Sequence, residues 1–545
     1  MTARATLPDL DALHPHELKA LIVAQHQEIF LQHEQLLSKN EQLTTQQEEL
    51  LTQREQLASR DAEIEHLKLL LAKLRRQQFG RKSEKLERQI EQLELRLDEL
   101  EAARAERLTA SPAPAVSATT AKAEGKPARQ ALPAHLPRET RQILPKQEAC
   151  PDCGGALKAL GEDVSELLEY VPEHFKVLRQ VRPKLACACC DKIVQAEAPS
   201  RPIARGLAGP GLLAHVLVAK YCDHLPLYRQ SEIYAREGVE LERSTLADWV
   251  GSSSALLEPL VEALRRHVLA GEKLHADDTP VPVLAPGNGK TKTGRLWTYV
   301  RDDRPCGDAT PPAVWFAYTP DRKGEHPQAH LRAFTGTLQA DGYAGYDAVY
   351  KDGRAREAAC LAHVRRQFFD LHQAHKSPVA KEALERIAAL YTIEEEIRGR
   401  AAEDRRAVRQ QRSLPLLHAL KQWLEETLGK LSKKSDTVRA VRYALGRWEA
   451  LLRFCDDGRL EIDNNAAERS LRAVVLGRKN YLFAGSDRGG ERAAAIYSLI
   501  GSAKLNGVNP EAYLRQVLSR IADHPVNHIA ELLPWNLTSQ SASLT

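Results

Sequence analysis

Four of the nine cysteines form two Cys-x-x-Cys pairs that could bind one metal ion. The pairs are Cys150 with Cys153, and Cys187 with Cys190. Two intervening residues let both thiolates of a pair reach one Zn²⁺ from a tight turn, and four thiolates complete a tetrahedral structural site without an open position for water. Cys189 is a surplus thiol that could replace Cys190. The spacing predicts a structural zinc site in a module at 146–197, with a two-stranded insert between the pairs.

Three acids, Asp277, Asp341 and Glu468, could form a different kind of metal site. Cutting or joining a phosphodiester commonly uses two Mg²⁺ ions, about 3.5–4 Å apart, held by a few carboxylates. Asp277 lies on a predicted first strand with apolar flanks, Asp341 ends a predicted fourth strand beside it, and Glu468 lies early on a helix. Buried acids are costly without a partner, and metal ions are the obvious partner.

Asp278 competes with Asp277 for a place in this triad. Neighbours on a strand face opposite sides, so only one of the two can contribute. Taken singly, most of the 73 Asp and Glu residues are solvated, and Glu468 would also be a favourable charge in the first turn of a helix. Only the combination of the three acids supports a metal site.

The first part of the chain, 16–108, has the pattern of a leucine-zipper-like coiled coil. Apolar residues recur there every seven positions; they are Ile22, Ile29, Leu36, Leu43, Leu50, Leu57, Ile64 and Leu71. The companion seam position is mostly polar before Leu67. This part should therefore be stable only with a partner helix, which predicts a homo-oligomer joined through the coiled coil.

The remaining sequence predicts a multidomain α+β protein. A flexible linker rich in Ala, Pro, Ser and Thr occupies 109–145, before the zinc module. The segment 206–270 is predominantly helical. Next, 271–490 has the order of strands and helices of an RNase H-like α/β domain, with a helical insertion at about 376–455. A C-terminal helical segment follows at 491–545.

Part of the helical region has the pattern of a helix-turn-helix. Gly238 would form the turn, and Ser244 would be the N-cap of the second helix. Any helical pair joined by a glycine turn gives the same pattern, so contact with DNA here stays open.

Composition excludes some classes of protein. The 545 residues have a formal net charge of +4, so a nucleic-acid surface would require local clustering of Lys and Arg. The sequence has no run of eighteen apolar residues and no signal-peptide pattern, so no membrane partner is expected. The clustered cysteines also fit the reducing cytoplasm.

Several motifs together resemble the insertion-sequence-66 family of bacterial transposases. These motifs are LHADDTPV, PDRKGEHPQAHL, LQADGYAGY, CLAHVRRQFFDL, DNNAAERSLR, GRKNYLFAGSDRGGERAAAIYSLI and ADHPVNHIAELLPW. The similarity runs through nearly the whole chain after the first few dozen residues, and it includes FGRKSEKL and the CPDCGG knuckle.

The resemblance implies an RNase H-like catalytic domain of the DDE type, whose acids fall on Asp277, Asp341 and Glu468. One departure is Asp278, where the family pattern leads us to expect Glu. The implied activity is Mg²⁺-dependent cleavage at an element's terminal inverted repeats and strand transfer into target DNA. The partners would be double-stranded DNA and a second copy of the chain, in the bacterial cytoplasm at the nucleoid. A requirement for other proteins of the same element is compatible with the resemblance.

Basic residues near the acids could neutralise DNA phosphates. They are Arg365, Arg366, Arg469, Arg472, Arg478 and Lys479. A solvated helix face would look the same. Two further functions stay open: a DNA-binding protein that kept the fold but lost catalysis, and a nuclease without strand transfer.

Overall fold

The structure is a computed structural model. It describes residues 39, 42, 59, 62–68, 70, 93, 96, 97, 100–103, 132–171, 174–285, 291–432, 435–480 and 484–537. The chain divides into two compact units, Met1–Arg81 and Lys82–Thr545. In the first unit, residues 62–68 are helical. Most of the predicted coiled coil and the first part of the predicted linker lie outside the described residues, so both stay predictions.

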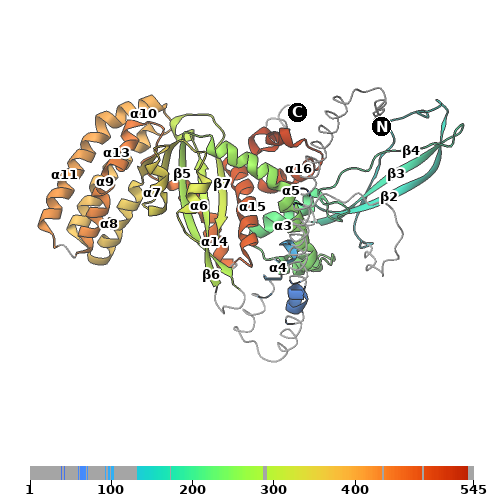
Figure 1. Cartoon of the computed structure of the whole chain (residues 1–545), viewed down its shortest axis with the longest axis horizontal. Helices are drawn as coiled ribbons and strands as arrows, with labels where there is room; N and C mark the ends of the chain where they lie inside the picture. Colours follow the sequence, from blue (N-terminus) through green and yellow to red (C-terminus); the bar gives the residue numbers. More distant parts are fainter. Residues whose placement is uncertain are drawn as a thin grey trace, which may run out of the picture. The chain divides into compact units, whose positions relative to one another are not determined.

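The paired cysteines lie at one end of a four-stranded sheet. It contains β1 (Arg138–Gln142), β2 (Leu157–Val171), β3 (His174–Cys187) and β4 (Ile193–Gln195). β2 and β3 form a long antiparallel hairpin, with Leu157 opposite Cys187 at its base (Figure 1). The predicted two-stranded insert is thus confirmed.

β1 corrects the sequence prediction, which places 138–142 in a flexible linker. This strand pairs in parallel with β3, from Arg138 opposite Val177 to Gln142 opposite Val181. Its sequence, RETRQ, is polar and largely exposed. The strand forms because β3 offers an edge for hydrogen bonds, which is a tertiary cause that the local sequence does not signal.

The predicted helical region contains three helices, α3 (Pro210–Tyr221), α4 (Leu227–Arg236) and α5 (Arg243–Leu269). Gly238, with φ +79°, forms the turn between α4 and α5, as predicted. The prediction that Ser244 is the N-cap of α5 was wrong. Glu242 holds that position with extended backbone (φ −65°, ψ 146°), so the helix begins before Ser244.

The β2–β3 hairpin is anchored to α3 by a buried acid. The N-cap of α3 is Gly209, which has no side chain to cap the helix. Instead, Glu169 on β2 accepts a hydrogen bond from the backbone N–H of Leu212 (2.6 Å). Tyr170 stacks on His215 of α3, with ring centroids 3.8 Å apart. These contacts fix the end of the hairpin that lies far from the cysteines.

A five-stranded sheet forms the centre of the second unit. Its strands are β5 (Lys273–Leu284), β6 (Thr291–Arg301), β7 (Ala313–Thr319), β8 (Gly336–Ala340) and β9 (Ala355–Ala359), in the order β7-β6-β5-β8-β9. β5, β6 and β7 are antiparallel, whereas β8 and β9 run parallel to β5. The connections contain η2 (Arg304–Cys306), α6 (Glu325–His330), η3 (Ala344–Tyr346) and α7 (Asp347–Lys351).

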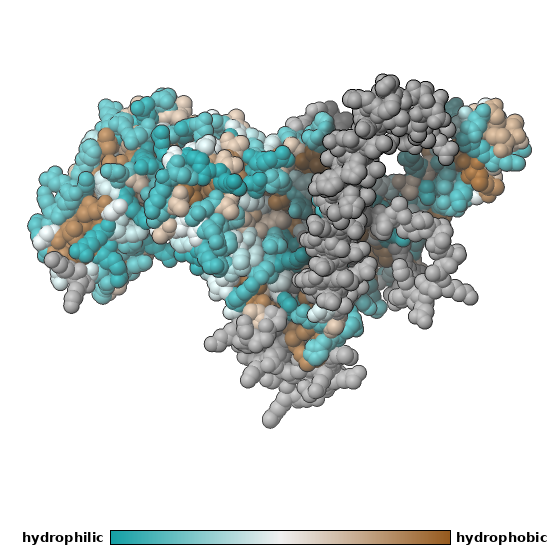
Figure 2. Space-filling model, in the orientation of Figure 1, coloured by the Kyte–Doolittle hydropathy of each residue, from teal (hydrophilic) through white to brown (hydrophobic). Residues whose placement is uncertain are grey.

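The predicted helical insertion follows β9. It contains α8 (Leu361–His375), α9 (Pro378–Ile397), α10 (Ala402–Val408), the π-helical turn η4 (Arg409–Ser413), α11 (Leu414–Lys430), α12 (Asp436–Leu445) and α13 (Trp448–Asp456). The helices α8, α9, α11, α12 and α13 share a hydrophobic core that is distinct from the main core around the sheet. Figure 1 shows α8, α9, α11 and α13 side by side as one bundle. On the face shown in Figure 2, the surface of this bundle is largely hydrophilic.

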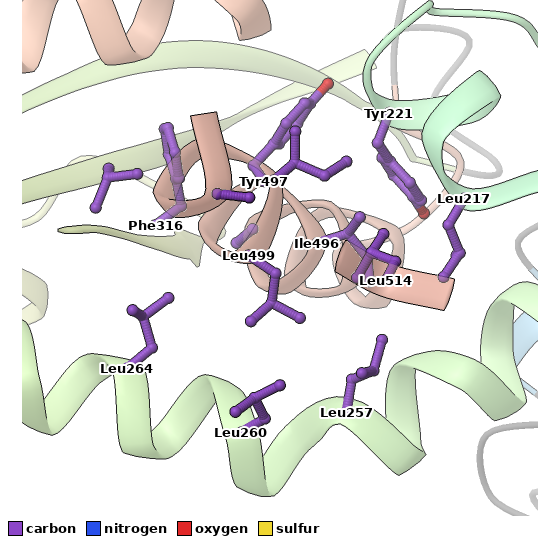
Figure 3. Close-up of a cluster of buried hydrophobic side chains, with 14 of the residues drawn as sticks. Leu217, Tyr221, Leu257, Leu260, Leu264, Phe316, Ile496, Tyr497, Leu499 and Leu514 are labelled. Atoms are coloured by element: carbon purple, nitrogen blue, oxygen red, sulfur yellow. The ribbon is translucent and has the colours of Figure 1, made fainter. Parts of the chain in front are cut away.

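Four elements follow the insertion: α14 (Asn465–Asn480), α15 (Asp487–Leu505), α16 (Pro510–Leu518) and η5 (Val526–Leu532). Figure 3 shows α15 in the middle of the main core, where Ile496 and Leu499 lie among side chains of α3, α5, β7 and α16. The sequence-predicted boundary at 490/491 therefore falls inside a helix. The helix α15 is continuous across this boundary, so its first turn and its buried apolar residues form one element.

Among the described residues, no helix is both long and apolar enough to cross a membrane.

Candidate functional site

The four paired cysteines come together at the base of the β2–β3 hairpin. Sulfur atoms of Cys150 and Cys190 lie 3.4 Å apart, as do those of Cys153 and Cys187. Zn–S bonds of about 2.3 Å would place tetrahedral thiolates at similar spacing. Cys190, and not Cys189, completes the group whose sulfur atoms all lie within 4.8 Å of one another. The donor set therefore fits a structural zinc ion.

Backbone amides favour the thiolate form of two of these cysteines. The N–H of Cys189 donates to the sulfur of Cys187 (3.3 Å), and this bond is the main cause that lowers the pKa of Cys187 to about 6. The backbone N–H groups of Asp152 and Cys153 lower the pKa of Cys150 in the same way. Thiolates are the form that binds zinc.

Asp277 and Asp341 lie at the same edge of two adjacent parallel strands. The last registered pair of β5 and β8 is His275 opposite Gln339. Asp277 and Asp341 each come two residues later, Asp277 within β5 and Asp341 directly after β8. The sheet therefore places two acids, far apart in the sequence, beside one another.

Glu468 reaches this edge from the first turn of α14, which packs on β5 and β6. The start of α14 is fixed by the fully buried Asn464. Its side-chain amide donates to the carbonyl of Ala276 (2.8 Å), and its carbonyl oxygen pairs with Nδ1 of His275 (3.1 Å). Burial lowers the pKa of His275 to about 4, so the ring is neutral and its Nδ1–H can donate to Asn464. These bonds join the helix that carries Glu468 to the strand that carries Asp277.

We expect Asn464→Ala to lower the free energy of unfolding by about 1–3 kcal/mol, because it leaves buried groups of His275 and Ala276 without partners. Urea denaturation followed by circular dichroism measures this change. Asn465→Ala is the matched control, since the side-chain amide of Asn465 donates to neighbouring Asp463 and to no other described residue. Equal losses in the two variants would contradict the role of Asn464 as the link to β5.

Asp278, the competitor of Asp277, is held by arginines. Its side chain is 1% exposed and accepts hydrogen bonds from Arg295 (2.8 Å) and Arg322 (2.8 and 3.0 Å). Arg322 also lies 3.5 Å from a carboxylate oxygen of Asp341. Asp278 is therefore already neutralised by protein groups, which favours Asp277 as the acid available to a metal ion.

Asp277 is surrounded by like charge. The pKa of Asp277 is raised to about 7, mainly by burial and also by the nearby carboxylates of Asp341, Asp278 and Glu468, whereas one hydrogen bond from the backbone N–H of Asp278 opposes the rise. The oxygen atoms of the triad are not all within 4.8 Å of one another, unlike the two closer ligand groups found among the described residues.

We expect Asp277→Asn to stabilise the protein at pH 8 in Mg²⁺-free buffer. The folded state keeps the Asp277 proton up to about pH 7, whereas the unfolded chain loses it near pH 4, so the contribution of Asp277 to stability falls as the pH rises through this window. The variant should melt about 2–4 °C higher than wild type at pH 8, with a smaller difference at pH 5. Thermal melts at both pH values test this. A variant that is less stable at pH 8 would contradict it.

The predicted phosphate-binding residues divide into two groups. Arg365 and Arg366 on α8, and Arg469 and Arg472 on α14, are exposed, and none forms an ion pair within the described part of the chain. Arg478 instead donates to the carbonyl of Pro280 within β5 (2.6 Å), so it links α14 to this strand. The side chain of Lys479 lies outside the described residues.

Two residues of the site were missed by sequence reasoning. Arg322 lies in the motif PDRKGEHPQAHL, and its role depends on an ion pair with Asp278 that only the fold creates. Asn464 lies in the motif DNNAAERSLR, whose sequence indicates the start of a helix. Its side chain, however, donates a hydrogen bond to the neighbouring strand β5.

Comparison with known proteins gives matches over most of the chain. The family described as "Transposase IS66 family" matches residues 205–492, and "IS66 C-terminal element" matches 498–535. "Transposase C of IS166 homeodomain" matches 66–141, and "zinc-finger binding domain of transposase IS66" matches 147–191.

Two relatives are similar to this chain over most of its length. The uncharacterized protein y4hP of Sinorhizobium fredii (strain NBRC 101917 / NGR234) is 42% identical over 498 residues, covering 88% of this chain and 89% of the relative. The uncharacterized protein y4qI of the same strain is 44% identical over 418 residues, covering 75% and 77%.

The matched modules define the class of protein: this is a transposase, with domains that support DNA binding and a structural zinc site. More particularly, the chain belongs to the IS66 family of transposases. The resemblance deduced from the sequence motifs is thereby confirmed.

Proposed function

We propose that this transposase cuts DNA at the terminal inverted repeats of its insertion sequence and joins the freed 3′ ends to target DNA. Asp277, Asp341 and Glu468 would hold two Mg²⁺ ions. The observation that carries this proposal is the register of the parallel strands β5 and β8, which places Asp277 and Asp341 at matching positions. The carboxylates of Asp341 and Glu468 also repel that of half-buried Asp277 and help to raise its pKa to about 7. Divalent cations would remove this repulsion, and no Lys or Arg forms an ion pair with Asp277 among the described residues.

The arrangement of the sheet supports an RNase H-like catalytic domain. Three antiparallel strands followed by two parallel ones, in the order β7-β6-β5-β8-β9, bring Asp277 and Asp341 to one edge. The insertion α8–α13 then returns the chain to α14 and Glu468. In this proposal the catalytic domain is 271–490 with its insertion at about 376–455.

Each part of the site has a distinct task in the reaction. Bound Mg²⁺ would activate the attacking oxygen and stabilise the leaving oxygen of the phosphodiester. The three acids hold these charges on rigid elements, and Asn464 keeps α14 against β5. Arg365, Arg366, Arg469 and Arg472 are exposed near Glu468 and would neutralise the neighbouring DNA phosphates.

The other domains would assemble the DNA ends. The zinc module and the helical region at 206–270 would recognise or position the inverted repeats. The coiled coil at 16–108 would join two copies of the chain, because both ends of the element have to be processed in one assembly. Other proteins of the same element could join this assembly.

A strand-transfer assay tests the proposal. Purified protein is incubated with Mg²⁺, a duplex that ends in the element's inverted repeat, and a target plasmid. Joined products support the proposal. Cleavage without joining would instead indicate a nuclease, and binding without cleavage would indicate a DNA-binding protein that has lost catalysis.

A further inference from the structure

The first turn of α8 faces the first turn of α14 beside the acidic edge. His363 on α8 places Nδ1 3.8 Å from Oε1 of Glu468. This nitrogen is buried and has no hydrogen-bond partner among the described residues. Among the described residues, the acid that this nitrogen pairs with is thus one of the three proposed metal ligands.

This contact results from two hydrogen bonds that join the start of α8 to the start of α14. The backbone N–H of Leu361 donates to the carbonyl of Ile462 (3.0 Å). The backbone N–H of Asn464 donates to the sulfur of Cys360 (3.1 Å). Because both bonds join the start of α8 to the residues just before α14, His363 and Glu468, each in a first turn, are held opposite one another.

We propose that His363 is a positioning residue that donates its Nδ1–H to Glu468 and orients this carboxylate toward the catalytic cations. The proposal rests on the function proposed above. At 3.8 Å the pair is slightly longer than a hydrogen bond, and the Glu468 side chain is 42% exposed, so a small rotation of the carboxylate closes the distance. One carboxylate oxygen is then fixed by His363, and the other is free for metal.

Cys360, His363 and Glu468 could instead be read as three ligands of one metal ion, since their ligand atoms lie within 4.8 Å of one another. The surroundings of the sulfur favour a structural role for Cys360. It already accepts the N–H of Asn464, and burial raises its pKa to about 12, which favours the neutral thiol. A buried thiol that accepts a backbone hydrogen bond fits a link between helices better than a metal ligand.

Three variants of α8 test the positioning role. His363→Ala removes the donor, whereas His363→Asn keeps an N–H donor near the position of Nδ1. His375→Ala is the matched control, because His375 is an exposed histidine on the same helix. Mn²⁺ binding to the protein with inverted-repeat DNA is measured by electron paramagnetic resonance, and joining rates are measured against Mg²⁺ concentration.

We expect His363→Ala to weaken Mn²⁺ binding and to raise the Mg²⁺ concentration for half-maximal joining by about 10–100-fold, the usual effect of losing an outer partner of a metal ligand. His363→Asn should recover most of the loss, and His375→Ala should match wild type. Wild-type Mn²⁺ binding and Mg²⁺ dependence in His363→Ala would overturn the proposal. Loss of joining at saturating Mg²⁺ in both His363 variants would also overturn it, because His363 would then act on the DNA.

A Co²⁺ titration separates the competing metal-ligand role. With the four-cysteine site already filled by zinc, we expect no thiolate-to-cobalt absorption band. A band that disappears in Cys360→Ser would overturn the positioning role. Asp341→Asn separates this inference from the proposed function: if it joins DNA normally, the function fails, whereas a normal His363→Ala beside an inactive Asp341→Asn overturns only the inference.

Discussion

Asp341→Asn and Glu468→Gln are each expected to reduce DNA joining by more than about 100-fold. Losing a residue that only supports a metal ligand costs up to about 100-fold, and losing a ligand itself should cost more. Each change removes one negative charge that would hold the catalytic cations. The same loss of charge relieves the repulsion around Asp277, so the variants should fold at least as well as wild type. A strand-transfer assay measures joining, and thermal melts measure folding.

Binding of inverted-repeat DNA should survive in both variants, because the exposed arginines of α8 and α14 are unchanged. Glu357→Gln is a useful control, since Glu357 on β9 is another acid of the same sheet but is paired with Arg447. It should keep most of the joining activity. Near-normal joining by Asp341→Asn or Glu468→Gln would remove the triad assignment.

Elements with a strong apolar pattern could be predicted closely from the sequence. The apolar, β-branched and aromatic run AVWFAYT forms β7, Ala313–Thr319, because its residues favour a strand and almost all of them are buried. The alternation of a strand likewise predicted that Asp277 and Asp278 face different surroundings. The structure adds that Arg295 and Arg322 surround Asp278, which the sequence had left as an open competitor.

Features that depend on a distant partner could not be predicted in this way. β1 is a strand only because β3 offers an edge to a polar segment. Asn464 forms its hydrogen bond with Ala276, 188 residues away, and no local pattern distinguishes that role from a helix cap. The contact of His363 with Glu468 likewise depends on hydrogen bonds between the starts of α8 and α14, such as that from the backbone N–H of Asn464 to the sulfur of Cys360. These residues act by holding other side chains in place, so only the folded structure shows their role. The acids that could bind metal, in contrast, stand out in the sequence motifs.

Removal of zinc is expected to unfold one end of the β2–β3 hairpin and to leave the other end folded. Near the start of β2, the residues from Lys158 to Glu162 are exposed, so the zinc site is the main constraint on that end. The other end is held by the buried side chains of Leu168, Phe175 and Val177, which belong to the main core. Structural zinc contributes about 10–16 kcal/mol in small zinc-binding peptides, far more than this exposed end could gain from burial.

Hydrogen exchange measured by mass spectrometry can resolve the two ends, whereas near-ultraviolet circular dichroism sums over the 6 Trp and 14 Tyr residues of the whole chain and cannot separate them. After chelation, or in Cys187→Ser, amides near Leu185 should exchange more than about 100-fold faster, because local opening no longer breaks metal bonds. Amides near Val177 should stay protected. Cys189→Ser is the matched control, since Cys189 lies outside the group of four and should leave exchange unchanged. Unchanged exchange near Leu185 without zinc would show that the hairpin base is stable by itself, and the cysteines would then need another explanation.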